Sequence, residues 1–328
     1  MVGAVLTRPA VDLDRATAIL GEAWGIAGVL RPLPSERDRN FAVAPAGAEA
    51  YVLKISNAAE DAAVLAFQHE AMGRLDAAGV PCQLPVPTPA GETIVSVDLG
   101  TGSGPILARL LTWLPGRQLA TVPPHQRSEA LLRDLGWTMG RSAAALARWD
   151  HPAAHRPFQW EAGRGLGVID AHAAAVMDPE RAALLAAWRA RLEPLAQILP
   201  GLRHGVIHND ANDHNVLVDD AGERVSGLLD LGDAVWSVVV NELAVAAAYA
   251  ALDAPDPLAV IAAIRGGFEA ACPLTEDERV VVPDLVALRL ATSVSLSAHQ
   301  SRLDPDDAYL TVSEKPAWDL LARLAVAA

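Results

Sequence analysis

The polar stretch His208-Asn209-Asp210-Ala211-Asn212-Asp213-His214-Asn215 interrupts a part of the chain that is otherwise rich in Ala, Leu and Arg. It contains the pattern His-x-Asp-x-x-x-x-Asn, and the apolar residues 216–218 follow directly. Residues 219–223 are mostly polar and include a glycine, and residues 227–229 are again apolar. Two short apolar runs separated by such a turn predict a loop followed by a β-hairpin.

This hairpin would bring two oxygen-bearing side chains together. If its strands pair about the turn, Val218 lies opposite Gly227, and Asn215 lies opposite Asp230. An amide oxygen and a carboxylate are too few to enclose a metal alone. They suit a magnesium ion that keeps water molecules and shares nucleotide phosphates.

Asp210 would stand on the loop before the hairpin, within reach of the same region. There it can accept a proton from a substrate hydroxyl during phosphoryl transfer. A turn or helix-cap carboxylate is the alternative for each acidic residue taken singly, but their joint spacing favours a catalytic site. For His208 we expect a supporting role in the loop rather than catalysis.

Lysine is rare in this chain, because every basic residue is arginine except Lys54 and Lys315. Lys54 lies in an alternating strand pattern that places Tyr51, Leu53 and Ile55 on one face and the lysine on the other. A solvated strand lysine is the alternative to a functional one. The scarcity of lysine makes Lys54 a candidate for function.

The chain changes character at residues 114–117, where Pro115 and Gly116 break the pattern. We therefore predict an N-terminal nucleotide-binding lobe over residues 1–114 and a catalytic and substrate-binding lobe over residues 115–328. Predicted elements of the first lobe are helices at 12–24 and 61–78 and strands at 26–33, 40–44, 50–55, 83–86, 92–97 and 106–113. Predicted helices of the second lobe are 125–149, 179–199, 238–252, 258–271, 276–297 and 308–326.

Composition excludes several classes of protein. The 328 residues carry 26 basic and 40 acidic side chains, a formal charge of −14, so nucleic-acid binding through a basic surface is not expected. Cys82 and Cys272 are too few for a disulfide framework or a zinc cluster, which fits a reducing compartment.

No membrane segment is expected. Asp12 and Asp14 precede any long apolar stretch, so the start of the chain does not resemble a signal peptide. The longest apolar region, residues 234–252, contains Asn241 and Glu242 and reads as a buried helix. We predict a cytoplasmic protein without a membrane partner.

Five stretches carry a resemblance to a known family: Leu33-Pro34-Ser35, Asn40-Phe41, Tyr51-Val52-Leu53-Lys54-Ile55, Leu111-Thr112-Trp113-Leu114-Pro115-Gly116 and residues 208–218. With these, nearly the whole chain resembles the kinase-like fold of the aminoglycoside phosphotransferase superfamily. It is most similar to hydroxylysine kinases and to the kinase domains fused to class III aminotransferases. The resemblance implies an α+β, two-lobed protein-kinase-like fold, with one helix inside a small N-terminal sheet lobe and a larger, mostly helical C-terminal lobe.

The resemblance also implies a role for five residues. Lys54 becomes the lysine that binds the nucleotide phosphates, Glu70 its partner on the following helix, and Asp210 the catalytic base. Asn215 and Asp230 become the ligands of Mg²⁺, with ATP or GTP as the phosphoryl donor. A compact ammonium on a rigid strand supplies a point charge at the phosphates, which a guanidinium does not imitate.

Two departures separate this chain from protein kinases. The turn at residues 35–40 contains no glycine, so phosphate contacts would come from backbone N–H groups or from Ser35 and Arg37. Asp230 is followed by leucine rather than phenylalanine, and no Ala-Pro-Glu segment follows. Both departures disfavour a protein substrate.

We therefore expect a kinase that phosphorylates a hydroxyl of a small aminated metabolite, with a hydroxylysine-like acceptor favoured. An aminoglycoside or another amino alcohol is the alternative acceptor, and a catalytically silent nucleotide-binding module is the alternative of another class. The acceptor pocket is poorly specified by the sequence. Its candidates are Trp160, Arg164, Trp236 and Glu242.

Overall fold

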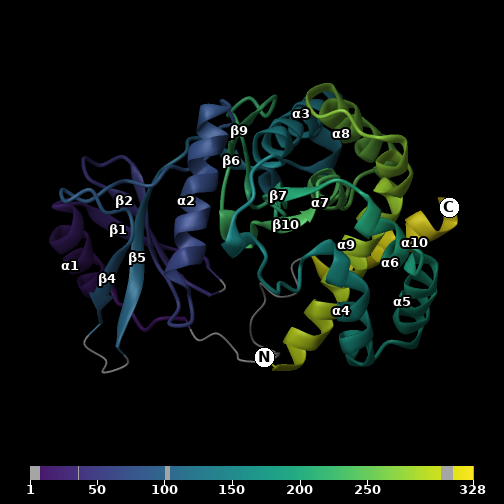
Figure 1. The fold of residues 1–328 in the computed structure, drawn as a ribbon, viewed down its shortest axis with the longest axis horizontal. Helices are drawn as coiled ribbons and strands as arrows, with labels where there is room; N and C mark the ends of the chain where they lie inside the picture. Colours follow the sequence, from purple (N-terminus) through teal and green to yellow (C-terminus); the bar gives the residue numbers. More distant parts are fainter. Residues whose placement is uncertain (1–7, 36, 100–103, 304–312, 328) are drawn as a thin grey trace. The chain divides into compact units, whose positions relative to one another are not determined.

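A computed structural model describes residues 8–35, 37–99, 104–303 and 313–327. The chain divides into two units, residues 1–77 with 81–115 and residues 78–80 with 116–328. The first unit holds an antiparallel sheet with two helices, and the second is mostly helical (Figure 1), which confirms the predicted α+β class. The assignment of nucleotide binding to the first lobe and catalysis to the second stays a prediction.

The first unit is built on a five-stranded sheet. Its strand order is β1-β2-β3-β5-β4, and all neighbours are antiparallel. Helices α1 and α2 lie on opposite faces of this sheet (Figure 1). The elements are α1 (Leu13–Trp24), β1 (Val29–Leu33), β2 (Arg39–Ala44), β3 (Tyr51–Ile55), α2 (Ala62–Ala77), β4 (Val95–Asp98) and β5 (Pro105–Thr112).

The faces of β3 follow the predicted alternation. Leu53 and Ile55 are fully buried in the apolar cluster that packs against α1. Lys54 points to the other face and is itself only 5% exposed. On that face it is paired across the ladder with Arg109 of β5, which is hydrogen-bonded to Gln68 of α2. Lys54 is therefore not a solvated strand lysine.

The predicted strand at residues 83–86 is wrong. This segment forms only an isolated bridge between Pro85 and Leu111, with flanking backbone bonds from Val86 to Leu110 and from Thr112 to Leu84. Prolines 81, 85 and 87 remove the N–H donors that a regular ladder needs.

The second unit contains small sheets among its helices. Strands β7 and β10 form a two-stranded sheet, and β6, β8 and β9 form a three-stranded one. The strands are β6 (Arg117–Gln118), β7 (His204–Ile207), β8 (Val216–Val218), β9 (Val225–Leu228) and β10 (Val235–Val238). The helices are α3 (Glu129–Leu146), α4 (Gly165–His172), α5 (Pro179–Leu192), α6 (Leu195–Ile198), α7 (Asn241–Ala250), α8 (Pro257–Ala271), α9 (Glu276–Leu303) and α10 (Glu314–Ala327).

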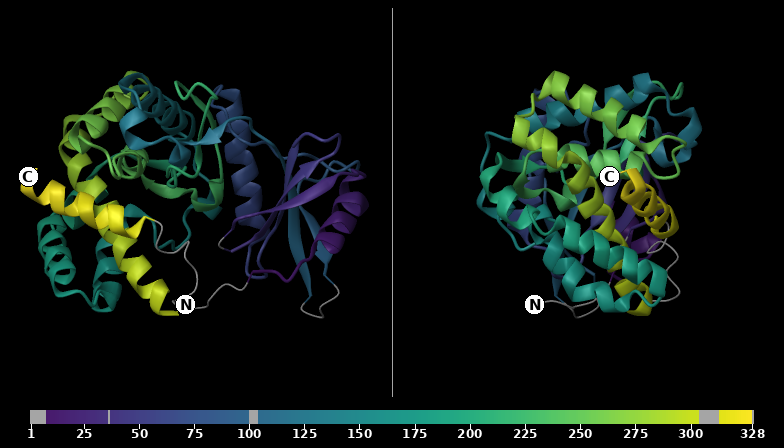
Figure 2. Two further views of the ribbon diagram at one scale, coloured as in Figure 1. Left: turned by 180° about the vertical axis from the view of Figure 1, so that it is seen from behind. Right: turned by 90° about the vertical axis from the view of Figure 1, so that its right-hand side faces the viewer.

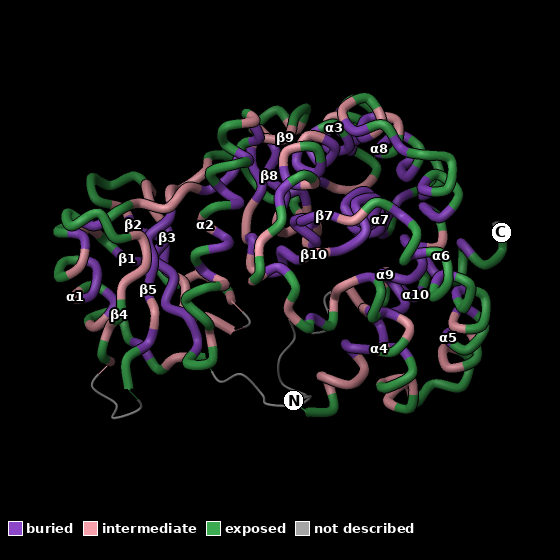
Figure 3. Tube along the Cα trace, viewed as in Figure 1, coloured by how far each residue is buried: buried purple, intermediate pink, exposed green. Residues whose placement is uncertain are grey.

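Helix α7 lies at the centre of this unit. All of its residues are buried (Figure 3), and it packs against α3, α8 and α9. The predicted helix at 238–252 is thus confirmed in its central part, but its start is wrong, because the chain before Val239 pairs as β10. Two polar residues, Asn241 and Glu242, begin α7 and are carried into the interior.

Helix α9 is long and apolar enough to cross a membrane by length and composition alone. However, 78% of its most apolar window is buried inside the protein. It packs against α4, α7 and α10, and the yellow helix α10 is visible beside it in Figure 2. This burial is typical of a core helix.

His69 on α2 makes the stability of the first unit depend on pH. Burial and the nearby Arg109 lower the pKa of His69 from 6.5 to about 4. The unfolded chain therefore binds a proton more readily than the folded one, so stability is complete above about pH 6.5 and is lost as the pH falls toward 4. We expect a loss of about 3 kcal/mol between pH 7 and pH 4 from this group.

Urea unfolding of wild type and His69→Gln across this pH range measures the effect. The variant should lack this part of the pH dependence, whereas His125→Gln, at an exposed histidine, should keep it. A wild-type slope in His69→Gln would contradict the assignment.

Candidate active site

The predicted catalytic loop connects β7 to β8 in the second unit. It leaves β7 at His208, and Asn209 adopts a left-handed conformation with φ of +65°. Asparagine tolerates this conformation better than other residues with a β-carbon. Asn209 thereby turns the chain directly before Asp210.

A buried carboxylate holds the start of this loop. Glu242 of α7 is fully buried and accepts hydrogen bonds from the backbone N–H groups of His208, at 3.0 Å, and Asn209, at 2.9 Å. It also accepts one from the hydroxyl of Ser142 on α3, at 3.0 Å. Glu242 is thus a positioning residue, and its predicted candidacy for the acceptor pocket is wrong because it has no exposed surface.

His208 supports the loop from within, as predicted. Its Nε2 lies 2.9 Å from the carbonyl oxygen of Leu229, so this nitrogen donates and carries the proton. Its Nδ1 then accepts from the backbone N–H of Asp210, at 3.2 Å. Both ring nitrogens are engaged and the side chain is fully buried, which leaves His208 no role as a base.

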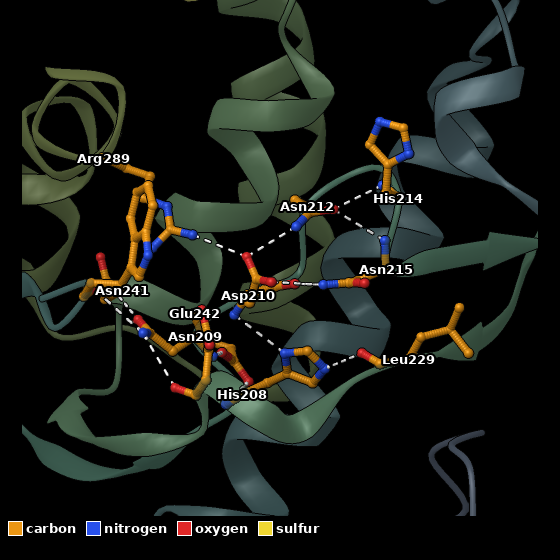
Figure 4. A network of polar contacts seen from close by, with 12 residues as sticks. His208, Asn209, Asp210, Asn212, His214, Asn215, Leu229, Asn241, Glu242 and Arg289 are labelled. Carbon is orange, nitrogen blue, oxygen red and sulfur yellow. Dashed lines mark hydrogen bonds and ion pairs between the residues drawn. The ribbon is translucent and has the colours of Figure 1, made fainter. Parts of the chain in front are cut away.

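The side chain of Asn209 ties the loop to two further segments. Its amide nitrogen donates to the carbonyl oxygens of Trp160 and Asp233, at 3.3 and 3.4 Å. Its amide oxygen accepts from the side chain of Asn241, at 3.0 Å. The loop is therefore tied to α7 through Asn241, as Figure 4 shows, and also to the segments that carry Trp160 and Asp233.

The carboxylate of Asp210 is the centre of the network in Figure 4. Its Oδ1 accepts from Nδ2 of Asn212 and from Nη2 of Arg289, both at 3.0 Å. Its Oδ2 accepts from Nδ2 of Asn215, at 2.7 Å. Three donors on three sides give the carboxylate a single orientation, while 18% of its side chain stays exposed.

Burial raises the pKa of Asp210 well above its usual range, and the neighbouring Asp233 and Asp230 raise it further. Arg289 and Asn212 act in the opposite direction. A carboxylate with a raised pKa is a stronger proton acceptor than an exposed one. This environment suits the role of a general base.

The predicted pairing of the hairpin is wrong by one residue. Val216 pairs with Leu228, and the backbone N–H of Leu229 donates to the carbonyl of Asn215, so Asn215 lies opposite Leu229 rather than Asp230. At a register irregularity between Leu217 and Val218, β9 contains one extra residue, so Val218 pairs with Val225 instead of Gly227.

Asp230 nevertheless belongs to this site. Its own left-handed backbone, with φ of +56°, redirects the chain directly after β9, and its Oδ1 accepts from the N–H of Gly232 at 3.0 Å. Its charge acts on Asp210 and raises the pKa of that carboxyl. The structure thus brings Asp210, Asn215 and Asp230 into one region, as predicted.

The oxygens of this site fit a magnesium ion that is shared with nucleotide phosphates. The amide nitrogen of Asn215 is bonded to Asp210, which leaves its amide oxygen as the atom to bind a cation. Asp230 adds one carboxylate. Among the described residues, no group of three or more His, Cys, Asp or Glu side chains could hold a metal by itself. Such a sparse set requires phosphate and water oxygens to complete the shell.

The other predicted site residues lie in the first unit. Lys54 is buried on β3, and Glu70 is exposed on α2. Ser35 accepts from the backbone N–H of Asp38, at 3.2 Å, within the turn between β1 and β2 that also carries Arg37. The roles of Lys54, Glu70, Ser35 and Arg37 in nucleotide binding stay predictions.

Three candidates for the acceptor pocket have different settings. Trp160 lies against the guanidinium of Arg289, with 4.3 Å between the ring centroid and Cζ. Trp236 stacks on His155, and Arg164 is exposed.

Arg289, the ion-pair partner of Asp210, is a site residue that was not among the candidates from the sequence. The sequence feature that could have identified it is its position as a single arginine in the middle of the otherwise apolar run 285–291.

Comparisons with known proteins agree with this architecture. The sequence profile of the phosphotransferase enzyme family matches residues 29–281. Hydroxylysine kinase of Mus musculus is 32% identical over an alignment of 343 residues that covers 97% of this chain and 90% of the relative.

Two solved structures share the fold. A microcompartment-associated aminopropanol kinase matches with a TM-score of 0.73 at 16% identity, covering 96% of this chain and 98% of that one. Amicoumacin kinase, solved with AMP-PNP and Ca²⁺, matches with a TM-score of 0.72 at 16% identity, covering 95% and 93%.

Proposed function

Because the chain belongs to the phosphotransferase enzyme family, we propose that it transfers the γ-phosphoryl group of ATP or GTP to a hydroxyl of a small acceptor that bears an amine. A hydroxylysine-like amino acid is the favoured acceptor. The similarity to hydroxylysine kinase over nearly the whole chain supports this choice.

The observation that carries the proposal is the setting of Asp210. Its carboxylate is oriented by Asn212, Asn215 and Arg289, and its remaining exposed surface is where an acceptor hydroxyl would donate its proton. Asn215 and Asp230 would hold Mg²⁺, which supplies positive charge to the phosphates when it is bound. A module that only binds nucleotide has no need of an oriented base, which disfavours the silent alternative.

The nucleotide phosphates would be held by the first unit. In this proposal Lys54 provides a buried point charge at the phosphates and Glu70 directs it, while Ser35 and Arg37 contribute from the turn between β1 and β2. The turn is held in shape by Asp38, whose carboxylate accepts from the backbone N–H of Asn57, at 3.2 Å. A preformed turn lowers the cost of ordering the phosphate contacts.

A phosphorylation screen with Mg²⁺ and either ATP or GTP tests the proposed function. We expect 5-hydroxylysine to give a higher kcat/KM than 1-amino-2-propanol and than any aminoglycoside. Loss of the acceptor amine should lower kcat/KM by about 10²-fold or more, since it leaves buried polar groups unpaired. A preference for aminoglycosides or for 1-amino-2-propanol would replace the favoured acceptor by the alternative one. Absence of turnover with every acceptor, with nucleotide binding intact, would favour a silent module.

A further inference from the structure

Arg289 lies beside the proposed base and is almost entirely buried. Its side chain is 5% exposed, and its Nη2 lies 3.0 Å from Oδ1 of Asp210. The ring of Trp160 lies 4.3 Å from Cζ and that of Tyr249 lies 5.5 Å from it. The guanidinium thus stands in the wall of the site that the acceptor hydroxyl must enter.

Two of the three guanidinium nitrogens have no hydrogen-bond acceptor. Nε and Nη1 are buried and unpaired among the residues that the structure describes. Burial alone lowers the pKa of Arg289, but Tyr249, Asp210 and Asp233 raise it, so the group keeps its charge. Unpaired donors of a buried cation are costly, and they are expected where a ligand completes the hydrogen bonding.

The shape of the group restricts the ligand. Guanidinium N–H bonds lie in one plane, and aromatic rings lie against this group, so a ligand has to approach along the edge of the plane. Among the edges of this plane, the one formed by Nη1 and Nη2 can give a planar carboxylate two parallel hydrogen bonds. Asp233 acts electrostatically on both Arg289 and Asp210, so an ammonium next to the bound carboxylate would meet an acidic neighbour.

We propose that Arg289 binds the carboxylate of a hydroxy amino acid acceptor and so selects amino acids over amino alcohols. This inference rests on the proposed function and deepens it, since it names the part of the acceptor that decides specificity. The carboxylate would accept from Nη1 of Arg289 and from the second N–H of Nη2, while the acceptor hydroxyl reaches Asp210, which accepts from the first N–H of Nη2.

The test compares 5-hydroxylysine with 1,5-diaminopentan-2-ol, which keeps both amines and the hydroxyl but lacks the carboxylate. In wild type we expect kcat/KM to favour 5-hydroxylysine by about 10²-fold. Arg289→Met should raise KM for 5-hydroxylysine and reduce this preference to less than about fivefold, and Arg289→Lys should restore part of it. Because the variant also removes the ion pair with Asp210, both substrates lose kcat alike, and the ratio isolates carboxylate binding.

Arg279→Met is the matched control, because Arg279 lies on the same helix but is exposed and paired with Glu269. It should keep the wild-type preference. A second measurement needs no variant: L-lysine should inhibit wild type competitively with the acceptor, and 1,5-diaminopentane should inhibit at least about tenfold more weakly.

The outcomes separate the two proposals. Equal use of both substrates by wild type, or an unchanged preference in Arg289→Met, would overturn the inference and leave the kinase assignment standing. Failure of wild type to phosphorylate either compound would overturn the proposed acceptor and the inference with it. Equal inhibition by L-lysine and 1,5-diaminopentane would also overturn the inference, even if Arg289→Met does not fold.

Discussion

Asp210→Asn is expected to lower kcat by about 10³-fold while the dissociation constant of the nucleotide changes by less than about threefold. The side chain keeps its size, but an amide cannot accept the proton of the acceptor hydroxyl. One of the donors that now point at the carboxylate would also face the new amide nitrogen, so one hydrogen bond is lost. Nucleotide affinity should persist, because the proposed phosphate contacts are made by other residues.

Single-turnover rates and nucleotide titrations of the same preparations measure the two quantities. Asp220→Asn is the matched control, since Asp220 is an exposed carboxylate in the turn between β8 and β9. It should behave as wild type. Equal turnover in Asp210→Asn and wild type would remove Asp210 from the mechanism, and a loss of nucleotide binding that accounts for the whole effect would assign it to binding.

Much of this architecture could be predicted because its signals are local. Alternation along residues 51–55 placed Lys54 on the face opposite Leu53, and the structure confirms this. Asp12 caps α1 by accepting from the N–H of Arg15, and Gly79, with φ of +68°, follows the end of α2. Each of these features depends on residues a few positions apart, which is the range over which sequence patterns report directly.

The register of the hairpin, that is, which residues of its two strands lie opposite each other, could not be predicted correctly. Counting outward from the turn assumes equal numbers of residues on both strands, and the irregularity at Leu217 and Val218 breaks that equality. Asp230 still reaches the site because its left-handed backbone changes direction there. A positive φ at a residue other than glycine has no reliable sequence signature.

The support of Asp210 by distant segments was invisible in the sequence for another reason. Arg289 lies 79 positions beyond Asp210, and Glu242 lies 34 beyond His208. These contacts depend on how α7 and α9 pack, and no local pattern encodes that packing. The pairing of the short strands β7 and β10 was missed likewise, because residues 235–240, which are apolar apart from Ser237, continue without a turn signal into the helix.

The charge of Asp230 should decide whether Mg²⁺ assists nucleotide binding. Asp230→Asn is the informative variant, because asparagine tolerates the left-handed backbone and keeps an oxygen for the N–H of Gly232. The other proposed ligand, Asn215, is neutral, so the variant removes the single negative charge that we assign to the metal. We expect kcat/KM for the nucleotide to fall by roughly 10²- to 10³-fold, with partial recovery at high Mg²⁺ concentration, because mass action offsets a weaker site. Titration of Mg²⁺ at fixed nucleotide, followed by thermal shift and by rate, measures both effects.

Asp253→Asn is the matched control, because Asp253 is another aspartate with a left-handed backbone, with φ of +54°. It is exposed and lies outside the network around Asp210, so the variant should leave the Mg²⁺ titration unchanged. The same Mg²⁺ dependence in Asp230→Asn and wild type would exclude Asp230 as a ligand and direct the search to Asp233, the second carboxylate that raises the pKa of Asp210.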